Sequence, residues 1–123
     1  MNLHYFSYES DPMLKCPCCG ERGMNEQFMM MLDELRAGVG FAFNITSGFR
    51  CPDYNSKLSS TGRTGPHTHG RAVDISATSR QKYLIMAAAR DFGWSRFGIG
   101  KNFIHVDSLN EADGFTPEVI WTY

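Results

Sequence analysis

Two short segments of the chain constrain its fold most, because each alternates apolar and polar residues in a pattern typical of a half-buried β-strand. They are residues 71–75 and 103–107, and in both every second residue is a Val or an Ile that would face a core. The same alternation places Asp74 in the first segment, and His105 and Asp107 in the second, on the opposite face. If the two strands are paired, Asp74 can meet His105.

A third residue, His67, can join this pair. It lies seven residues before Asp74 in a segment rich in Gly and Pro, 62–70, so that a loop must fold it back onto the polar face. Zinc accepts imidazole and carboxylate ligands, and catalytic zinc sites use three protein ligands and keep a fourth position for water. The sequence therefore predicts an open-sided zinc site made by His67, Asp74 and His105, and hence an enzyme. His4 is expected to be an ordinary surface residue.

Further motifs give the middle of the chain, about residues 44 to 107, a resemblance to the M15 metallopeptidases. The residues that carry it are Ser47-Gly48-Phe49-Arg50, Asn55, the pair His67 and Asp74, and the run 103–107. This family includes zinc D-Ala-D-Ala carboxypeptidases, the D-Ala-D-Ala dipeptidases of vancomycin resistance, and the L-alanyl-D-glutamate endopeptidases of bacteriophage endolysins. A short chain with an aromatic tail, Trp121-Thr122-Tyr123, resembles the phage and prophage members more loosely.

The resemblance implies a fold, a site and an activity. The fold is a small α+β domain over residues 1–123, with a central antiparallel sheet flanked by helices, as in Hedgehog and D,D-peptidase domains. His67, Asp74 and His105 match the family's zinc ligands, and Arg50 matches an arginine thought to bind a substrate oxygen, a role that suits a planar, permanently charged guanidinium. The implied activity is hydrolysis of an amide bond in the peptidoglycan stem peptide, by an endolysin-like or a D,D-carboxypeptidase-like enzyme.

Two positions depart from the family pattern. Gly65 stands where many members have Ser, and Asn102 stands where several members have an acidic general base. Because an amide cannot take a proton from water, the base must be another group. The candidates are Asp107, which could instead orient a ligand imidazole, His69 and, as the weakest, Glu111. The Asn102 departure also favours an alternative function, a zinc-stabilised module that binds peptidoglycan or a protein without cutting it.

Composition and charge argue against nucleic-acid binding and against a membrane-spanning protein. The net charge of -1 provides no basic face for nucleic acid, and no apolar run approaches the roughly 20 residues of a membrane-spanning helix. The start of the chain, 1–6, lacks the features of an export signal, so synthesis in a cytoplasm is expected. Action at the bacterial cell wall would then need another route, such as phage-induced permeabilisation or packaging in a virion. A monomer is expected.

The rest of the chain predicts alternating helices and strands. A helix is expected over 25–37, with Asn25 as N-cap and Gly38 just past its end, and a strand over 41–45. A second helix is expected over 52–58 and a third over 79–92, capped by Ser79 and ended by Gly93. The inward residues expected on the third helix are Leu84, Ala87, Ala88 and Phe92. A further strand is expected over 97–99, ahead of a turn at Gly100-Lys101.

Four cysteines form a separate pattern. Cys16, Cys18 and Cys19 resemble half of a zinc knuckle, but only Cys51 remains to complete it, and His4 would be a strained ligand. Reduced thiols are the default without an export signal. A packed, reduced cluster or one bridge to Cys51 is therefore favoured over a second metal. Because Cys51 follows Arg50, a bridge would brace the arginine.

Overall fold

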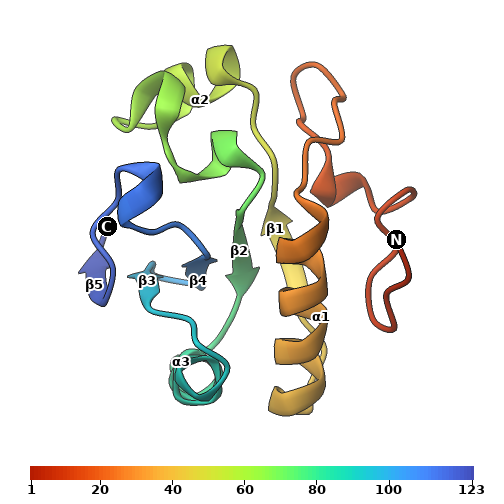
Figure 1. Ribbon diagram of the computed structural model, residues 1–123, viewed down its shortest axis with the longest axis vertical. Coiled ribbons are helices and arrows are strands. Elements are labelled where there is room, and N and C mark those ends of the chain that lie inside the picture. Colours follow the sequence, from red (N-terminus) through yellow and green to blue (C-terminus); the bar gives the residue numbers. More distant parts are fainter.

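The chain folds into three helices and a five-stranded sheet in a computed structural model that describes residues 1–123 (Figure 1). The helices are α1 (Glu26–Val39), α2 (Pro52–Leu58) and α3 (Ser79–Asp91), and the strands are β1 (Asn44–Ser47), β2 (Ala72–Ser76), β3 (Arg96–Ile99), β4 (Phe103–Asp107) and β5 (Val119–Thr122). Four 3-10 turns complete the chain: η1 (Pro12–Leu14), η2 (Gly62–Thr64), η3 (Pro66–His69) and η4 (Glu111–Asp113). The expected α+β class is confirmed.

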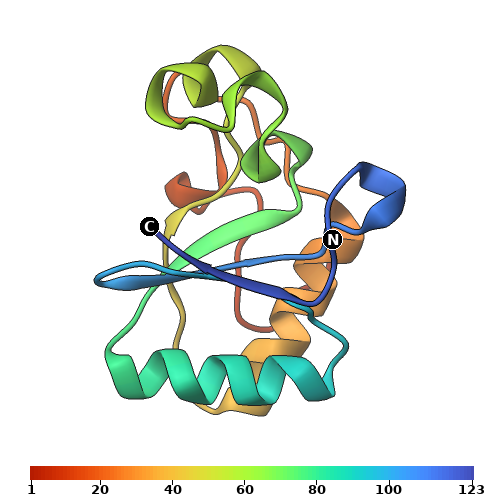
Figure 2. The same ribbon diagram turned by 90° about the vertical axis from the view of Figure 1, so that its left-hand side faces the viewer.

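The sheet has the strand order β1-β2-β4-β3-β5 and is antiparallel except for the parallel pair β3 and β5. Helix α3 lies along one face of the sheet and contacts α1, while α2 and the turns η2 and η3 rise over the other side (Figure 2). None of these helices has the length and apolarity that a bilayer crossing requires.

The core forms where the alternating segments pair, as the sequence predicts. Strands β2 and β4 are neighbours, and Asp74 lies directly opposite His105 in their register. Their apolar side chains are completely or almost completely buried and pack with residues of α1 and α3; the shared members are Val73, Ile75, Ile104, Val106, Phe28, Leu32, Leu35, Ile85 and Ala89. Burial of one face therefore fixes which side chains the other face presents.

Helix α1 begins as expected but ends later. The Asn25 side chain accepts a hydrogen bond from the Phe28 amide at 2.9 Å, the N-cap contact that the sequence predicts. The helix continues through Gly38 to a left-handed cap at Gly40, with φ of 86°. Gly38 has a packing role instead, since a Cβ there would lie 2.5 Å from the Phe92 ring.

The first strand was expected over 41–45 but runs over Asn44–Ser47. Its pairing with β2 starts where Asn44 meets Ser76. Phe41 and Phe43 precede the strand, with ring centroids 6.0 Å apart, and pack against the core from there. Their alternation reflects this local contact between two rings, not strand pairing.

Helix α3 differs from the expectation in its cap and in its buried face. Thr78 is the N-cap, in a reciprocal capping box with Gln81, so the predicted Ser79 cap is wrong. The buried residues are Lys82, Ile85 and Ala89. The predicted inward set is wrong by about one position, a rotation of 100°: Leu84, Ala87 and Phe92 are exposed and Ala88 is half-buried.

Lys82 explains this error. Its ammonium group donates to the carbonyl oxygens of Gly100 and Lys101 at 2.7 and 2.8 Å, in the turn between β3 and β4. The charge is satisfied there, so the methylene stem can lie on the buried face. Because a charged residue lies on the buried face of α3, the hydrophobicity pattern of the sequence does not identify that face correctly.

Strand β5 was not expected from the sequence. It adds Trp121 to the edge of the sheet beside β3, and Tyr123 follows directly after the strand. Gly98 of β3 makes room for the indole, because a Cβ at this position would lie 2.6 Å from Trp121 Nε1. The aromatic tail is thereby folded back over the polar face of the sheet.

The capping assignment is testable by one pair of variants. Thr78→Ala removes the side-chain acceptor at the start of α3 and is expected to lower the free energy of unfolding by about 1 kcal/mol. Ser79→Ala, the matched control, should change it by less than about 0.5 kcal/mol. Urea denaturation followed by circular dichroism measures both, and a larger effect for Ser79→Ala would contradict the cap at Thr78.

Candidate metal centre

His67, Asp74 and His105 come together on the polar side of the sheet. Each offers one ligand atom, and these three atoms all lie within 4.8 Å of one another. All three residues are buried. Asp74 and His105 come from the paired strands β2 and β4, and His67 comes from η3. The structure therefore brings together the three residues that the sequence predicts as metal ligands.

The loop that carries His67 requires a glycine. Gly70 joins η3 to β2 with φ of +69°, and a Cβ there would lie 2.0 Å from the carbonyl oxygen of Gly23. His67 Nδ1 lies 2.8 Å from the carbonyl oxygen of Gly48. Because a carbonyl can only accept, Nδ1 carries the proton, and the lone pair of the neutral ring sits on Nε2, which faces Asp74 at 3.3 Å.

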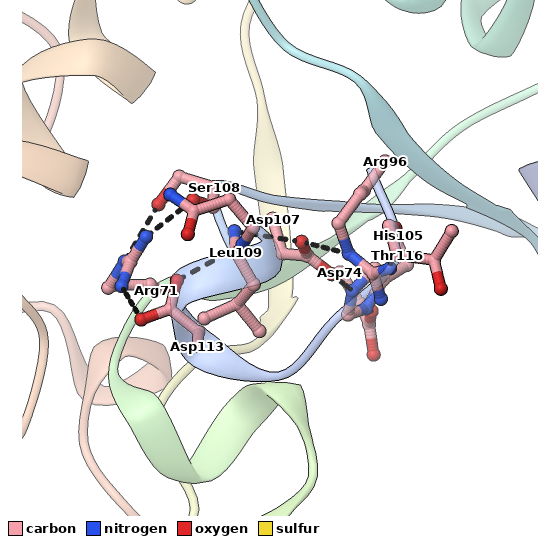
Figure 3. Close-up of polar contacts among 10 residues, drawn as sticks. Arg71, Asp74, Arg96, His105, Asp107, Ser108, Leu109, Asp113 and Thr116 are labelled. Carbon is pink, nitrogen blue, oxygen red and sulfur yellow. Dashed lines mark hydrogen bonds and ion pairs between the residues drawn. The ribbon is translucent and has the colours of Figure 1, made fainter. Parts of the chain in front are cut away.

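His105 is held between two carboxylates. Its Nε2 lies 2.7 Å from Asp107 Oδ2, and its Nδ1 lies 3.0 Å from Asp74 Oδ1 (Figure 3). Asp107 is in turn fixed at Oδ1 by Arg96 Nε at 2.7 Å and by the Leu109 amide at 3.1 Å. This network leaves Nδ1 of His105 as the atom directed at the ligand cluster.

The charges of the cluster follow from this network. Burial lowers the pKa of His67 despite the neighbouring Asp74. Burial opposes ionisation of Asp74, but the two neighbouring imidazoles, His105 and His67, outweigh it and lower the pKa of Asp74. Burial also acts against the charged form of His105, but Asp107 and Asp74 outweigh it and raise the pKa of His105. Near neutral pH the site combines a neutral His67 with an ionised Asp74.

This combination leaves two acceptors face to face. His67 Nε2 and Asp74 Oδ1 are 3.3 Å apart, and in these protonation states neither carries a hydrogen. A cation between them would turn the opposed lone pairs into ligand bonds and would take the place of the proton on His105 Nδ1. Two imidazole nitrogens and one carboxylate make a donor set that suits zinc. The residues present therefore fit a metal ion.

Arg50 borders the cluster, as the sequence predicts. Its Nε donates to Ser47 Oγ and its Nη1 to Asn55 Oδ1, both at 3.1 Å, while Nη2 lies 3.6 Å from Asp74 Oδ2. Asn55 is completely buried and also donates from Nδ2 to Thr61 Oγ1 at 2.9 Å. The guanidinium is thus oriented by two neutral groups, and its positive charge remains available on the side that faces the cluster of His67, Asp74 and His105.

A cleft of about 620 Å³ opens beside the cluster and includes Arg50 in its lining. Aromatic side chains form much of its wall: Phe103, Phe115, Trp121 and Tyr123. The Trp121 ring lies 5.2 Å from the His105 ring, centroid to centroid. No carboxylate side chain other than Asp74 lines the cleft. The cleft therefore combines an aromatic part with polar and charged side chains, and its two arginines, Arg50 and Arg96, outnumber its one carboxylate.

Arg96 is a cleft residue that sequence reasoning missed. It is buried, donates to the Thr116 carbonyl at 2.6 Å as well as to Asp107, and lies 5.0 Å from the centroids of both the Phe115 and Trp121 rings. The sequence does contain a signal for its position, because Arg96 begins a short alternating segment, residues 96 to 99. When this segment pairs with β4, Arg96 lies opposite Asp107.

The candidate general bases do not line the cleft. Asp107 is 1% exposed and directs its oxygens at Arg96, Leu109 and His105, so its contacts are those of an orienting group. His69 is exposed, with its ring on Phe115 at 5.5 Å, and lies outside the cleft lining. The same holds for two further residues, the exposed Glu111 and Asn102. The structure thus brings none of these four into the cleft.

Comparison with known proteins agrees with this geometry. A family model described as Peptidase M15 matches residues 5–107, a range that contains every residue of the cluster and Arg50. A search of curated proteins gives no match. The family-model match covers most of the chain, from the N-terminal segment to the end of β4. The chain therefore belongs to the peptidase family M15.

Proposed function

We propose that the protein is a zinc-dependent peptidase whose metal is held by His67 Nε2, His105 Nδ1 and the Asp74 carboxylate. The observation that carries this proposal is that two buried acceptors, His67 Nε2 and Asp74 Oδ1, face each other at 3.3 Å. A cation between them would accept a lone pair from each. Membership of the M15 family supports it. When bound, zinc supplies a water with a pKa near 7 and a Lewis acid for the scissile carbonyl, so that a strong base is not required.

The surrounding residues prepare the site. The Gly48 carbonyl selects the tautomer of His67, and Asp107 orients His105 through its other ring nitrogen. Arg50 is placed to stabilise negative charge that develops on the substrate oxygen, because its guanidinium is already fixed by Ser47 and Asn55. In this assignment Asp107 is a positioning residue and not the base.

The proposed substrate is a stem peptide of peptidoglycan. The motif resemblance to cell-wall peptidases supports this choice, and the cleft suits it in charge. Arg50 offers a cation to a peptide carboxylate, and Asp74 is the only acidic side chain in the lining. Both an endopeptidase and a D,D-carboxypeptidase are compatible with such a cleft. Activity at the bacterial cell wall, in a phage or prophage context, is part of the proposal.

A second candidate is a binding module that keeps the metal for stability. The specific observation in its favour is the lack of a free carboxylate in the cleft, since Asp74 is engaged by both histidines. This function uses the same cleft and the same ligand class. Only the fate of the peptide separates it from the peptidase.

One incubation separates these functions. The purified, zinc-loaded protein is mixed with peptidoglycan, and the new termini are identified by mass spectrometry. Release of free D-Ala indicates a carboxypeptidase, and new D-Glu amino termini indicate an endopeptidase. Absence of any product, together with retention of the protein on the wall material, would favour the binding module over the peptidase.

Arg50→Ala tests the role of the guanidinium. Loss of a preorganised donor to a developing oxyanion typically costs 10²- to 10³-fold in rate, so we expect kcat to fall by roughly that factor. Zinc content should remain at the wild-type value, because Arg50 is not a ligand. Arg63→Ala is the control, since Arg63 is exposed and paired with Asp53 away from the cleft lining. Unchanged kcat in Arg50→Ala would contradict the assignment.

His67→Ala and Asp107→Asn separate a ligand from an orienting residue. His67→Ala should lose the catalytic metal, whereas Asp107→Asn should keep the ligand set but bind zinc about 10- to 100-fold more weakly. Competition with a chromogenic chelator measures both affinities. Asp91→Asn, at the exposed end of α3, is the charge-matched control. Wild-type affinity in His67→Ala would remove His67 from the ligand set.

A further inference from the structure

The four cysteines, which the proposed peptidase site does not use, gather at one place. The sulfur atoms of Cys16, Cys19 and Cys51 all lie within 4.8 Å of one another, and none of the cysteines forms a disulfide. Cys16 and Cys51 are 35 positions apart in the chain, so the fold itself creates the cluster. Cys18 lies in the same turn as Cys16 and Cys19 and is exposed.

The turn that carries the first three cysteines has the form of a metal knuckle. Gly20 follows Cys19 with φ of +76°, and its amide donates to the Cys16 carbonyl at 2.9 Å. The Cys16 amide donates in turn to the Glu21 carbonyl at 2.9 Å. The backbone therefore curls around the Cys16 side chain, and its thiol is directed inward and completely buried.

Backbone amides point at the sulfurs. The Cys51 amide donates to Cys16 Sγ at 3.3 Å, and the Tyr54 amide donates to Cys51 Sγ at 3.4 Å. An N–H group directed at sulfur stabilises the thiolate over the thiol. Two sulfurs from distant parts of the chain thus lie at the same point with one backbone N–H group directed at each, and the thiolate is the form of cysteine that binds a metal.

We infer that Cys16, Cys19 and Cys51 form a second metal site, for a structural zinc ion, with Cys18 as its fourth ligand. Tetrahedral coordination with Zn–S bonds of about 2.3 Å places the sulfurs ~3.8 Å apart, within the spacing that the three already have. The sequence favoured a reduced cluster or a bridge because no second cysteine pair follows the knuckle. The fold supplies Cys51 instead, and the exposed Cys18 can turn to complete the set.

This site would brace the proposed catalytic arginine. Cys51 follows Arg50 directly and is the N-cap of α2, the helix that also carries Asn55. A metal that joins Cys51 to Cys16 would tie the N-terminal segment to the base of this helix. It would thereby hold Arg50 and its partner Asn55 in their positions relative to each other. The metal itself would lie away from the proposed catalytic centre and would not contact the substrate.

Cobalt substitution tests the inference independently of peptidase activity. Thiolate ligands give cobalt(II) an intense charge-transfer absorption in the near ultraviolet, whereas imidazole and carboxylate ligands do not. We expect this band in the cobalt-loaded full chain and in His67→Ala, and its loss in Cys51→Ser and Cys16→Ser. Elemental analysis of the zinc-loaded proteins should give two ions per wild-type chain and one in each of these three variants.

A measurement on the wild-type chain covers the case in which the serine variants fail to fold. In the zinc-loaded protein all four thiols should react slowly with a disulfide reagent, and a chelator should accelerate the reaction many-fold. Immediate reaction of Cys18 and Cys19 without chelator would overturn the site. So would a mass lower by two hydrogens, which indicates a disulfide, or a single zinc ion that is lost only with His67→Ala. Failure here leaves the His67 site untouched.

Discussion

The pairing of β2 with β4, in the register that sets Asp74 opposite His105, is the interaction on which the rest of the structure depends. The same pairing buries Val73 and Ile75 against the helices. A shift by one residue would turn the apolar side chains toward the cleft and the ligands into the core. The hydrophobic effect that stabilises the domain therefore also enforces the geometry of the proposed metal centre, and the two cannot vary independently.

The cluster of His67, Asp74 and His105 is oriented mainly by groups that lie behind it. A backbone carbonyl fixes His67, and Asp107, itself held by Arg96, fixes His105. These contacts leave one ring nitrogen of each imidazole, His67 Nε2 and His105 Nδ1, directed at Asp74. The side chains that could have served as a base are engaged in this support or lie outside the cleft. Such an arrangement suits chemistry in which the metal itself lowers the pKa of the attacking water.

Two parts of the chain hold the arginine side of the cleft. Asn55, a completely buried residue of α2, accepts a hydrogen bond from Arg50. At the N-cap of the same helix, the inferred cysteine site would join Cys51 to the N-terminal segment. A small domain has a limited core with which to fix a long, flexible side chain. A structural metal beside Arg50 would compensate for this.

The sequence by itself determined the two alternating strands, the start of α1 at Asn25 and the convergence of His67, Asp74 and His105, since all of these follow from short-range periodicity or from motif spacing. Only the tertiary structure decided the buried face of α3, the return of Trp121 over the sheet, the position of Arg96 in the cleft and the convergence of the cysteines. Each of these depends on partners that are remote in the chain. Lys82 is buried because two carbonyl groups of a distant turn satisfy its charge, and no local pattern records that such a turn will be there.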